Sequence, residues 1–281
     1  MAKRIGIIGY PLGHTLSPVF QQAGLDDLGV DAIFSAWPTA PEDLEATVAS
    51  FREDDCLGSC VTLPHKQAVM PLLDEIDDAA AEIGAVNWII NDDGKLRGYN
   101  TDAPGFLRAV KEELDFDPSG ADALVIGAGG AARAIVFALR DAGVSRLTIA
   151  NRTLSRAQAL ADDVRKGRFR AGAIELSRES LTDYAPYADL IVNTSSMGMA
   201  GGTAEDASPL DADLISDRTV VYDIVYAPAE TPLFLEAESA GARAATGLSM
   251  LVYQGVAGLE LATGLEAPAE LMLRTARAAG R

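Results

Sequence analysis

Residues 121–156 read ADALVIGAGGAARAIVFALRDAGVSRLTIANRTLSR, and this stretch decides the fold. A short apolar run breaks into a glycine-rich turn, an alanine-rich segment with helical spacing follows, and a second apolar run comes next. The order predicts a strand, a glycine turn, a helix and a second strand, which form one βαβ unit. Its first turn carries a dinucleotide-binding fingerprint, so the stretch predicts a doubly wound, Rossmann-type α/β domain.

Three small residues at the turn have separate physical roles. Gly127 permits the tight turn, and Gly129 has no side chain, so the backbone can approach a pyrophosphate. Ala132 lets the helix pack closely on the strand. Free N–H groups and the positive end of the helix dipole attract phosphate, so we expect a pyrophosphate at this turn.

The end of the second strand indicates which dinucleotide binds. NAD-binding units usually carry Asp or Glu there, which binds the ribose 2′-hydroxyl. This chain has Asn151-Arg152-Thr153 instead, with Arg156 one helical turn further on. Guanidinium groups suit a 2′-phosphate, so the sequence predicts NADP as the cofactor. The alternative is that both arginines are only solvated surface charges.

Composition limits the class of protein. The chain has 281 residues, enough for one large or two ordinary domains, and 48% are hydrophobic, enough for packed cores. No run reaches the roughly 18 apolar residues of a membrane span, and the N-terminus enters a strand-like run rather than a signal peptide. We therefore expect a soluble cytoplasmic protein with no membrane partner.

Charge and metal-ligating residues exclude further classes. A net charge of −18 with no basic stretch argues against nucleic acid as a partner. Cys56 and Cys60 are the two cysteines, and with only two histidines in the chain they form no recognisable metal-ligand spacing. We expect no metal site and no disulfide framework.

Strand and helix patterns alternate in the first hundred residues. Apolar periodicity predicts strands over residues 3–10, 32–37, 57–63, 86–91 and 96–99, and helices over residues 19–28, 41–51, 65–73 and 76–83. The last two strands are expected to form a hairpin. Ser17 resembles the N-cap of the first helix, with Pro18 at its first position. This alternation predicts an α/β layer.

The second half continues with a parallel sheet and ends in helices. The pattern predicts a helix over residues 103–114, strands over 171–176, 190–194 and 219–225, and helices over 248–263 and 268–279. We expect three parts: residues 1–102, an α/β domain that binds substrate; residues 103–238, a Rossmann-type NADP-binding domain; and residues 239–281, C-terminal helices that pack back on the first domain.

Polar clusters fall at the ends of predicted strands or the starts of helices. They are His14–Pro18, Thr62–Lys66, Gly84–Asn87, Asn100–Asp102 and Gln254. Such ends converge on one crevice in an α/β sheet, where ligands bind. Together with the glycine turn and the arginine-bearing strand end, the order of these clusters resembles the shikimate dehydrogenase family from about residue 7 to residue 263.

The resemblance implies a reaction and the residues that carry it. Members of the family reduce 3-dehydroshikimate to shikimate with NADPH, a step toward chorismate and the aromatic amino acids. Lys66 would be the acid–base group beside Asp102. The substrate carboxylate would be bound by Thr15 and Ser17. The remaining substrate positions would be Thr62, Asn87, Asp102 and Gln254 at the ring hydroxyls, and Tyr226 closing the site.

Cofactor positions are implied in the same way. The pyrophosphate would lie on Gly127, Ala128, Gly129, Gly130 and Ala131, and the 2′-phosphate on Asn151, Arg152, Thr153 and Arg156. Ile224 and Gly247 match positions near the nicotinamide, and Asp78 matches a further cofactor position. The resemblance leaves a monomer and a homodimer open.

Four positions depart from the family pattern. Cys60 stands where Asn is usual, Trp88 where Thr is usual and Gly255 where Ala is usual, and we expect all three to affect packing around the site. Thr15 stands where most members have Ser. Its extra methyl group and stiff χ1 are expected to favour shikimate over quinate, which is bulkier at the carboxylate-bearing carbon.

Simpler interpretations exist for single residues. A lysine in a helix is usually solvated, Asp102 can cap a helix that begins at Ala103, and His65 is expected to be structural. Two other functions stay open: a quinate or aminoshikimate dehydrogenase on the same scaffold, and a non-catalytic sensor of NADPH or a shikimate-like ligand. The presence of both Lys66 and Asp102 argues against the sensor.

Overall fold

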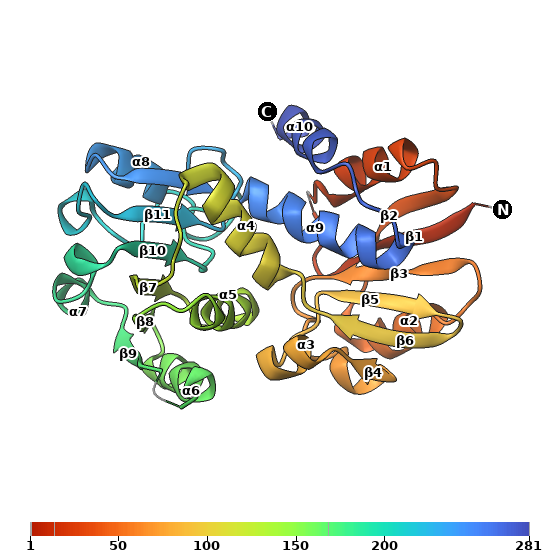
Figure 1. Cartoon of the computed structure of the whole chain (residues 1–281), viewed down its shortest axis with the longest axis horizontal. Helices are drawn as coiled ribbons and strands as arrows, with labels where there is room; N and C mark the ends of the chain where they lie inside the picture. The colour runs from red at the N-terminus through yellow and green to blue at the C-terminus, as the bar shows by residue number, and fades with distance from the viewer. Residues whose placement is uncertain (1, 14, 168, 281) are drawn as a thin grey trace. The chain divides into compact units, whose positions relative to one another are not determined.

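The chain divides into two compact units (Figure 1). The computed structural model describes residues 2–13, 15–167 and 169–280. Unit 1 comprises Met1–Gly105 and Leu251–Arg281, and unit 2 comprises Phe106–Met250. The helices α4 (Asp102–Leu114) and α9 (Leu248–Thr263) each run from one unit into the other.

Unit 1 is built on a six-stranded mixed sheet with the order β2-β1-β3-β5-β6-β4. The strands are β1 (Lys3–Gly9), β2 (Ala32–Pro38), β3 (Cys56–Val61), β4 (Glu75–Ile76), β5 (Trp88–Asp92) and β6 (Lys95–Tyr99). Strand β1 pairs in parallel with β2 and β3, while β5 is antiparallel to β3 and to β6. The expected hairpin is confirmed, and its turn at Asp93 and Gly94 has the positive φ angles that tight hairpins require.

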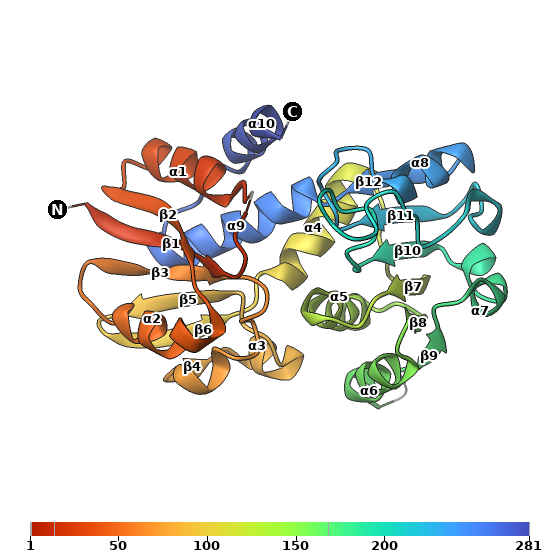
Figure 2. The same cartoon turned by 180° about the vertical axis from the view of Figure 1, so that it is seen from behind.

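Helices pack on both faces of this sheet, as the two opposite views show (Figures 1 and 2). They are α1 (Ser17–Asp27), α2 (Leu44–Ser50), α3 (Asp78–Ile83) and the unit 1 part of α9. Helix α10 (Ala269–Ala279) packs on α1. Glycines let α9 approach closely: a Cβ on Gly258 would lie 1.9 Å from the Trp88 ring, and one on Gly255 would lie 2.7 Å from the Phe20 ring. A second apolar cluster, which includes Val48 and Phe51, packs between α2 and the sheet.

Several expected helices of unit 1 differ from the structure: η1 (Pro41–Asp43) precedes α2, and Ile76 lies in β4, ahead of α3. The helix predicted over residues 65–73 is wrong, because that segment forms turns followed by the short 3₁₀ helix η2 (Met70–Leu72). Pro71 has no N–H to donate, which disfavours a continuous α-helix there. Helix α1 begins at Ser17 itself, which was expected to be the N-cap, and the Ser17 side chain does not cap the helix.

Unit 2 is built on a six-stranded parallel sheet with the order β12-β11-β10-β7-β8-β9, which confirms the Rossmann-type fold. The strands are β7 (Asp122–Ile126), β8 (Arg146–Asn151), β9 (Ala171–Glu175), β10 (Leu190–Asn193), β11 (Val220–Asp223) and β12 (Arg243–Thr246). The sequence pattern missed β12, which is short and pairs with β11. Residues 239–250, expected in the C-terminal helical part, therefore belong to unit 2.

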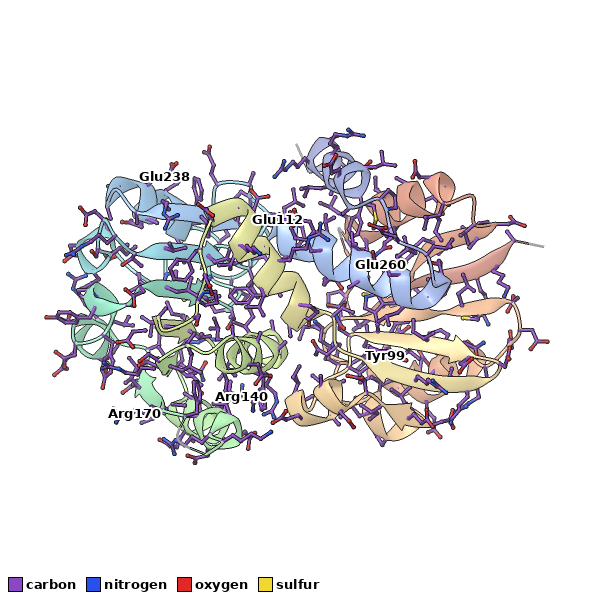
Figure 3. The ribbon with its side chains drawn as sticks, in the orientation of Figure 1. Tyr99, Glu112, Arg140, Arg170, Glu238 and Glu260 are labelled. Atoms are coloured by element: carbon purple, nitrogen blue, oxygen red, sulfur yellow. The ribbon has the colours of Figure 1, made fainter. Side chains whose placement is uncertain are left out.

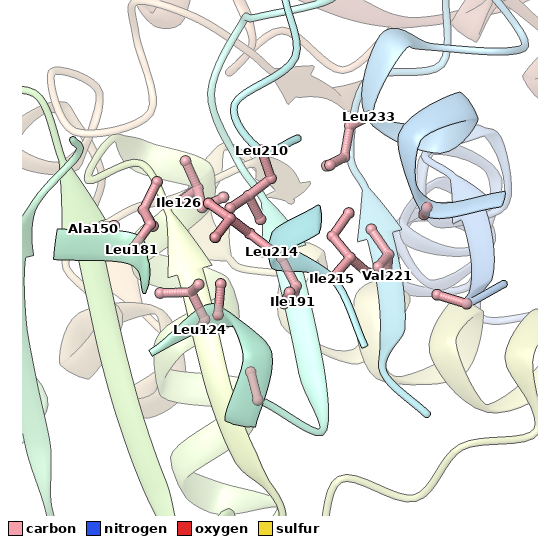
Figure 4. Close-up of a cluster of buried hydrophobic side chains, with 14 residues drawn as sticks. Leu124, Ile126, Ala150, Leu181, Ile191, Leu210, Leu214, Ile215, Val221 and Leu233 are labelled. Carbon is pink, nitrogen blue, oxygen red and sulfur yellow. The ribbon is translucent and has the colours of Figure 1, made fainter. Parts of the chain in front are cut away.

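Four helices follow the strands of unit 2 along the chain: α5 (Gly130–Asp141), α6 (Leu154–Val164), α7 (Arg178–Thr182) and α8 (Pro232–Ser239). Helix α5 follows the glycine turn, and seven of its twelve residues are buried, with Ala132 fully so, as its expected close packing requires. One face of the sheet carries an apolar cluster of strand residues such as Leu124 and Ile191 with Leu214 and Leu233 (Figure 4). The sheet is thus covered well enough to hold its strand ends in fixed positions.

Candidate active site

Lys66 and Asp102 form a largely buried ion pair in unit 1. The Lys66 ammonium donates to Asp102 Oδ2 at 2.5 Å, and the two side chains are only 14% and 7% exposed. Lys66 lies in the turns after β3, where its carbonyl accepts from the Val86 N–H at 2.8 Å. A lysine held in this way is not a solvated surface charge.

Asp102 is the first residue of α4, but its carboxylate does not cap the helix. Asn100 does so, because its Oδ1 accepts from the N–H groups of Asp102 at 3.1 Å and Ala103 at 3.4 Å. The Asn100 amide also donates to the Ala85 carbonyl at 3.0 Å. The Asp102 carboxylate is therefore free to bind Lys66 on one oxygen and another residue on the other.

Asn87 supplies that second contact. Its Nδ2 donates to Asp102 Oδ1 at 2.9 Å, and the same group lies 2.9 Å from Thr101 Oγ1 and 3.2 Å from Gln254 Oε1. The side-chain oxygen of Asn87, Oδ1, accepts from the Thr101 N–H at 2.7 Å. Four predicted site residues, Lys66, Asn87, Asp102 and Gln254, are thus brought into one hydrogen-bonded network.

Trp88 belongs to this network, which the sequence pattern did not reveal. Its Nε1 donates to Gln254 Oε1 at 3.3 Å, and Gln254 Nε2 donates to the Leu251 carbonyl at 2.7 Å. The indole therefore orients an amide that is predicted to bind substrate, in addition to packing against α9. The sequence shows that Trp88 departs from the family pattern. Its hydrogen bond to Gln254 could not be predicted, because it depends on a contact between distant segments.

His65 and Cys60 support the network without a polar role in it. His65 is buried, and its Nε2 lies 2.7 Å from the Thr39 carbonyl oxygen, which is a structural contact as expected. Cys60 is buried on β3 opposite Trp88. Burial raises the pKa of the Cys60 thiol to about 12, against a smaller lowering by the Lys66 charge, so the thiol is neutral.

The residues predicted to bind a carboxylate lie at the start of α1. Thr15 Oγ1 accepts from the Ser17 N–H at 3.2 Å. The Ser17 hydroxyl is buried and has no hydrogen-bond partner in the part of the chain that the structure describes. Buried polar groups are normally paired, so this hydroxyl is available to a ligand. Thr62 is half-buried at the end of β3, and His14 lies outside the described residues.

The glycine turn of unit 2 has the geometry that a pyrophosphate needs. Gly127 has φ +114°, and a Cβ there would lie 2.4 Å from Thr194 Oγ1, so only glycine fits. A Cβ on Gly129 would meet nothing within 4 Å, which leaves open space beside the N-terminus of α5. Ala128, Gly130 and Ala131 complete this strand-to-helix turn.

The residues predicted to bind the 2′-phosphate follow β8. Asn151 Nδ2 donates to the Thr153 carbonyl at 2.9 Å, which shapes the turn into α6. Arg152 and Arg156 are exposed, and neither guanidinium has an ion-pair or hydrogen-bond partner among residues 2–13, 15–167 and 169–280. Unpaired guanidinium groups beside this turn are free to bind a phosphate.

Ile224 and Gly247 lie in contact at the ends of β11 and β12. A Cβ on Gly247 would be 2.0 Å from the Ile224 carbonyl oxygen, so a larger residue is excluded. Tyr226 is half-buried in the same unit, and burial raises the pKa of its phenol. Asp78 belongs to unit 1, where it is exposed at the first position of α3.

A groove of about 470 Å³ in unit 1 is separate from the predicted substrate residues. It is lined by Tyr99, Asn100, Thr101, Pro104, Ala257 and Leu261, with the acids Asp77 and Glu260 (Tyr99 and Glu260 are labelled in Figure 3). It shares Thr101 with the network but none of the residues expected to bind substrate. An anionic substrate is also disfavoured beside two carboxylates that have no cation among the lining residues.

Membrane-spanning and metal-binding features do not occur among the described residues. None of their helices is both long enough and apolar enough to cross a membrane. None of their histidine, cysteine, aspartate and glutamate side chains gather in a group of three that could hold a metal ion. Both cysteines are buried free thiols.

Three family models match the chain in sequence order. They describe a shikimate dehydrogenase substrate-binding domain at residues 7–89, shikimate/quinate 5-dehydrogenase at residues 109–223, and a shikimate 5′-dehydrogenase C-terminal domain at residues 247–277. A shikimate dehydrogenase (NADP(+)) of Methanopyrus kandleri is 44% identical over 270 residues, which cover 95% of this chain and 92% of that protein.

Solved structures are similar over the whole chain. Shikimate 5-dehydrogenase from Thermus thermophilus, in complex with NADP(H) and shikimate, is 38% identical with a TM-score of 0.88, and 99% of each chain is covered. Quinate dehydrogenase from Corynebacterium glutamicum, in complex with NAD, is 32% identical with a TM-score of 0.90, again with 99% of each chain covered.

Proposed function

The chain belongs to the shikimate dehydrogenase family, and on that premise we propose that it catalyses the reversible, NADP-dependent reduction of 3-dehydroshikimate to shikimate. It is an oxidoreductase that acts on a CH–OH group. The reaction serves the synthesis of chorismate and the aromatic amino acids. The observation that carries the proposal for the chemistry is the 2.5 Å bond between Lys66 and Asp102.

Lys66 is the acid–base residue of this proposal. Bound NADPH supplies the hydride. As the substrate carbonyl is reduced, negative charge develops on its oxygen, and the Lys66 ammonium stabilises that charge and donates a proton to it. Asp102 holds the ammonium in place through Oδ2, while Asn87 fixes the carboxylate through Oδ1. In the oxidising direction neutral Lys66 accepts the hydroxyl proton.

The substrate is held by hydroxyl and amide groups of unit 1. We assign the carboxylate to the hydroxyls of Thr15 and Ser17, and the buried, unpartnered Ser17 hydroxyl supports this assignment. The ring hydroxyls are assigned to Thr62, Asn87, Asp102 and Gln254, and three of these four belong to the hydrogen-bonded network. Tyr226, whose phenol stays protonated, is available as a further donor.

The residues present in unit 2 fit NADP. Open space at Gly129 and the free N–H groups at the start of α5 accommodate a pyrophosphate, for which we assign Gly127–Ala131. Asn151, Arg152, Thr153 and Arg156 are assigned to the 2′-phosphate. Ile224 and Gly247 are assigned to the nicotinamide. Asp78 remains a prediction from the family resemblance, because no contact in the structure supports it.

Initial rates test this proposal directly. Reduction of 3-dehydroshikimate is measured with NADPH and with NADH, and oxidation of shikimate and of quinate is measured with NADP and with NAD. We expect shikimate with NADP to give the highest kcat/KM. A higher kcat/KM for quinate would change the substrate but not the family. Saturable NADPH binding without turnover of any of these substrates would favour the sensor instead.

A further inference from the structure

A second buried carboxylate lies in unit 2, at the ends of β10 and β11. Asp223 is 1% exposed and is the last residue of β11. Its Oδ1 accepts from Asn193 Nδ2 at 2.9 Å and from the Val225 N–H at 3.0 Å, and its Oδ2 accepts from Thr231 Oγ1 at 2.7 Å. All three donors are neutral.

These donors come from three different segments of the unit. Asn193 is the last residue of β10, Val225 lies in the loop after β11, and Thr231 caps α8 by accepting from the Phe234 N–H at 3.2 Å. The Ile224 N–H also donates to the Asn193 carbonyl at 3.0 Å. One carboxylate therefore fastens the ends of two neighbouring parallel strands to the start of a helix.

The network reaches the glycine turn on one side. Asn193 Oδ1 accepts from the N–H of Ser195 at 3.0 Å and from its hydroxyl at 2.7 Å, which shapes the loop after β10. In that loop Thr194 packs against Gly127, where a Cβ would lie 2.4 Å from Thr194 Oγ1. Asp223 is therefore two contacts away from the turn assigned to the pyrophosphate.

The network also reaches the residues assigned to the nicotinamide. The Val225 N–H is bound by Asp223, and the Val225 carbonyl accepts from the Gly247 N–H at 3.1 Å. Gly247 in turn packs directly on the Ile224 carbonyl. Dinucleotides bind outside the carboxyl ends of parallel strands, and Asp223 lies at that edge of the sheet.

We propose that Asp223 is a positioning residue for the dehydrogenase reaction: through Asn193 and Val225 it fixes the two strand-end loops that place the nicotinamide end of the cofactor. This inference rests on the proposed function. Asp223 is assigned no contact with substrate or cofactor and acts through the residues that it binds.

The electrostatics of the site agree with a working role. Burial raises the pKa of Asp223 to about 6, although the bonds from Thr231, Val225 and Asn193 each lower it. An ionised carboxylate that is buried among neutral donors lowers the stability of the folded state. Groups of this kind concentrate at functional sites. Above that pKa both oxygens are unprotonated and can accept from all three donors at once.

The test compares variants of the whole enzyme. Asp223→Asn keeps the shape but replaces an acceptor with a donor, Thr231→Val removes one donor and leaves the carboxylate, and Thr231→Ser restores the hydroxyl. Asp189→Asn is the matched control, because Asp189 accepts a backbone N–H at the opposite end of β10. For each variant we would measure kcat, both KM values, the NADPH Kd by fluorescence titration and circular dichroism.

We expect Asp223→Asn to lower kcat by about 10- to 100-fold, since misplacement of reacting groups by about 1 Å costs that much. NADPH Kd should rise, while the KM for 3-dehydroshikimate and the circular dichroism spectrum stay unchanged. Thr231→Val should move the same values in the same direction, and Thr231→Ser should restore them. If Asp223→Asn does not fold, Thr231→Val and Thr231→Ser decide the question.

Two outcomes would overturn the inference. One is that Asp223→Asn and Thr231→Val match Asp189→Asn in kcat and in NADPH Kd. The other is that the KM for 3-dehydroshikimate rises as much as the NADPH Kd, which indicates general loosening rather than positioning of the cofactor. If the unmodified enzyme does not reduce 3-dehydroshikimate, the proposed function fails, and the NADPH titration still tests Asp223, because equal Kd values would refute it.

Discussion

Among the described residues, each unit contains one buried aspartate in a hydrogen-bonded network, and the two aspartates differ in their partners. Asp102 in unit 1 binds the ammonium of Lys66 and the amide of Asn87. Asp223 in unit 2 binds an amide, a hydroxyl and a backbone N–H, with no cation among them. Both aspartates lie at the end of an element: Asp102 begins α4, and Asp223 ends β11.

The difference shows how one residue type can serve two purposes. A carboxylate paired with a cation orients a group that can donate a proton, so the pair in unit 1 can take part in chemistry. A carboxylate bound only by neutral donors has no cationic acid beside it that could transfer a proton. It can still fix several segments of the chain at once. We therefore interpret unit 1 as the site of proton transfer and the Asp223 network as a support for cofactor placement.

Removing the Lys66 ammonium leaves Asp102 in surroundings like those of Asp223. Of the changes considered, this one should have the largest effect on kcat. Lys66→Ala leaves Asp102 with neutral donors only, and the proton donor is lost. We expect kcat to fall by about 10²–10⁴-fold, the usual contribution of a general acid–base group, with little change in NADPH affinity. Steady-state kinetics with NADPH titration would measure this.

Lys95→Ala is the matched control, since Lys95 in the same unit is exposed and pairs with Glu75 on the surface. We expect its kcat to stay at the level of the unmodified enzyme. Near-normal turnover of Lys66→Ala would remove the distinction between the two aspartates, and another proton donor would then be needed.

The cationic residues predicted to act in the two units differ as well. Lys66 in unit 1 is largely buried and paired with Asp102, while Arg152 and Arg156 in unit 2 are exposed and available to bind a phosphate. Charge-assisted contacts to a phosphate contribute about 1.5–3 kcal/mol each, so two can favour NADPH over NADH by roughly a hundredfold or more. Arg152→Asp should remove much of that preference by repelling the 2′-phosphate. The ratio of kcat/KM values for the two cofactors measures it.

Arg218→Asp is a control with the same charge change in unit 2. Arg218 is exposed just before the amino end of β11, whereas the cofactor residues are predicted at the carboxyl ends of the strands. Its cofactor preference should be unchanged. Equal kcat/KM values for NADP and NAD in the unmodified enzyme would contradict the assignment of both arginines.

The neutral surroundings of Asp223 predict a pH-dependent stability. Its pKa rises from 3.8 to about 6 on folding, so the folded state holds the proton more tightly than the unfolded state. The stability that this difference contributes is fully present below the pKa of Asp223 in the unfolded state. It is lost as the pH rises through the pKa in the folded state, and the free energy of unfolding falls by about 3 kcal/mol in all. Asp223→Asn does not titrate and escapes this loss.

Denaturant unfolding at several pH values between about 4 and 7 measures the difference. The free energy of unfolding of Asp223→Asn, relative to the unmodified protein, should rise over this range by up to about 3 kcal/mol. Asp189→Asn removes an exposed carboxylate of the same unit and is the control for the loss of one negative charge. A difference independent of pH would mean that Asp223 is not buried as an ionised group in solution.

Thr15 should give the smallest effect. Its Oγ1 accepts from the Ser17 N–H, so its own hydroxyl proton stays available for a carboxylate, and serine would keep both interactions. The extra methyl of Thr15 should disfavour quinate, but one added group typically shifts discrimination by only about 1–3 kcal/mol. We expect Thr15→Ser to prefer shikimate still, by a smaller ratio of kcat/KM values. An unchanged ratio would show that the methyl lies away from that carbon.

Much of the fold could be predicted because its signals are local. The apolar runs of β7 and β8, the turn at Gly127 and the spacing of α5 are read from neighbouring residues, and the structure has them where expected. Elements with weak local signals were missed or mistaken. Strand β12 has only four residues, and residues 65–73 have helical spacing interrupted by Pro71.

The candidate site divides in the same way. Its residue types stood out because polar clusters fall at strand ends, and the family resemblance added roles to them. The hydrogen bond from Trp88 to Gln254 joins residues 166 positions apart, and no local pattern encodes such a contact. Asp223 and Asn193 were missed because each looks like an ordinary polar residue at the end of an apolar strand.

By itself, the sequence determined the Rossmann-type unit, the two arginines that favour a 2′-phosphate and the set of polar clusters that resembles the family. Only the tertiary structure decided that Lys66 is buried against Asp102, that Asn100 rather than Asp102 caps α4, and that Asp223 is surrounded by neutral donors. Periodicity and turn chemistry are properties of neighbouring residues, whereas burial and partner choice arise when segments distant in sequence pack together and exclude water.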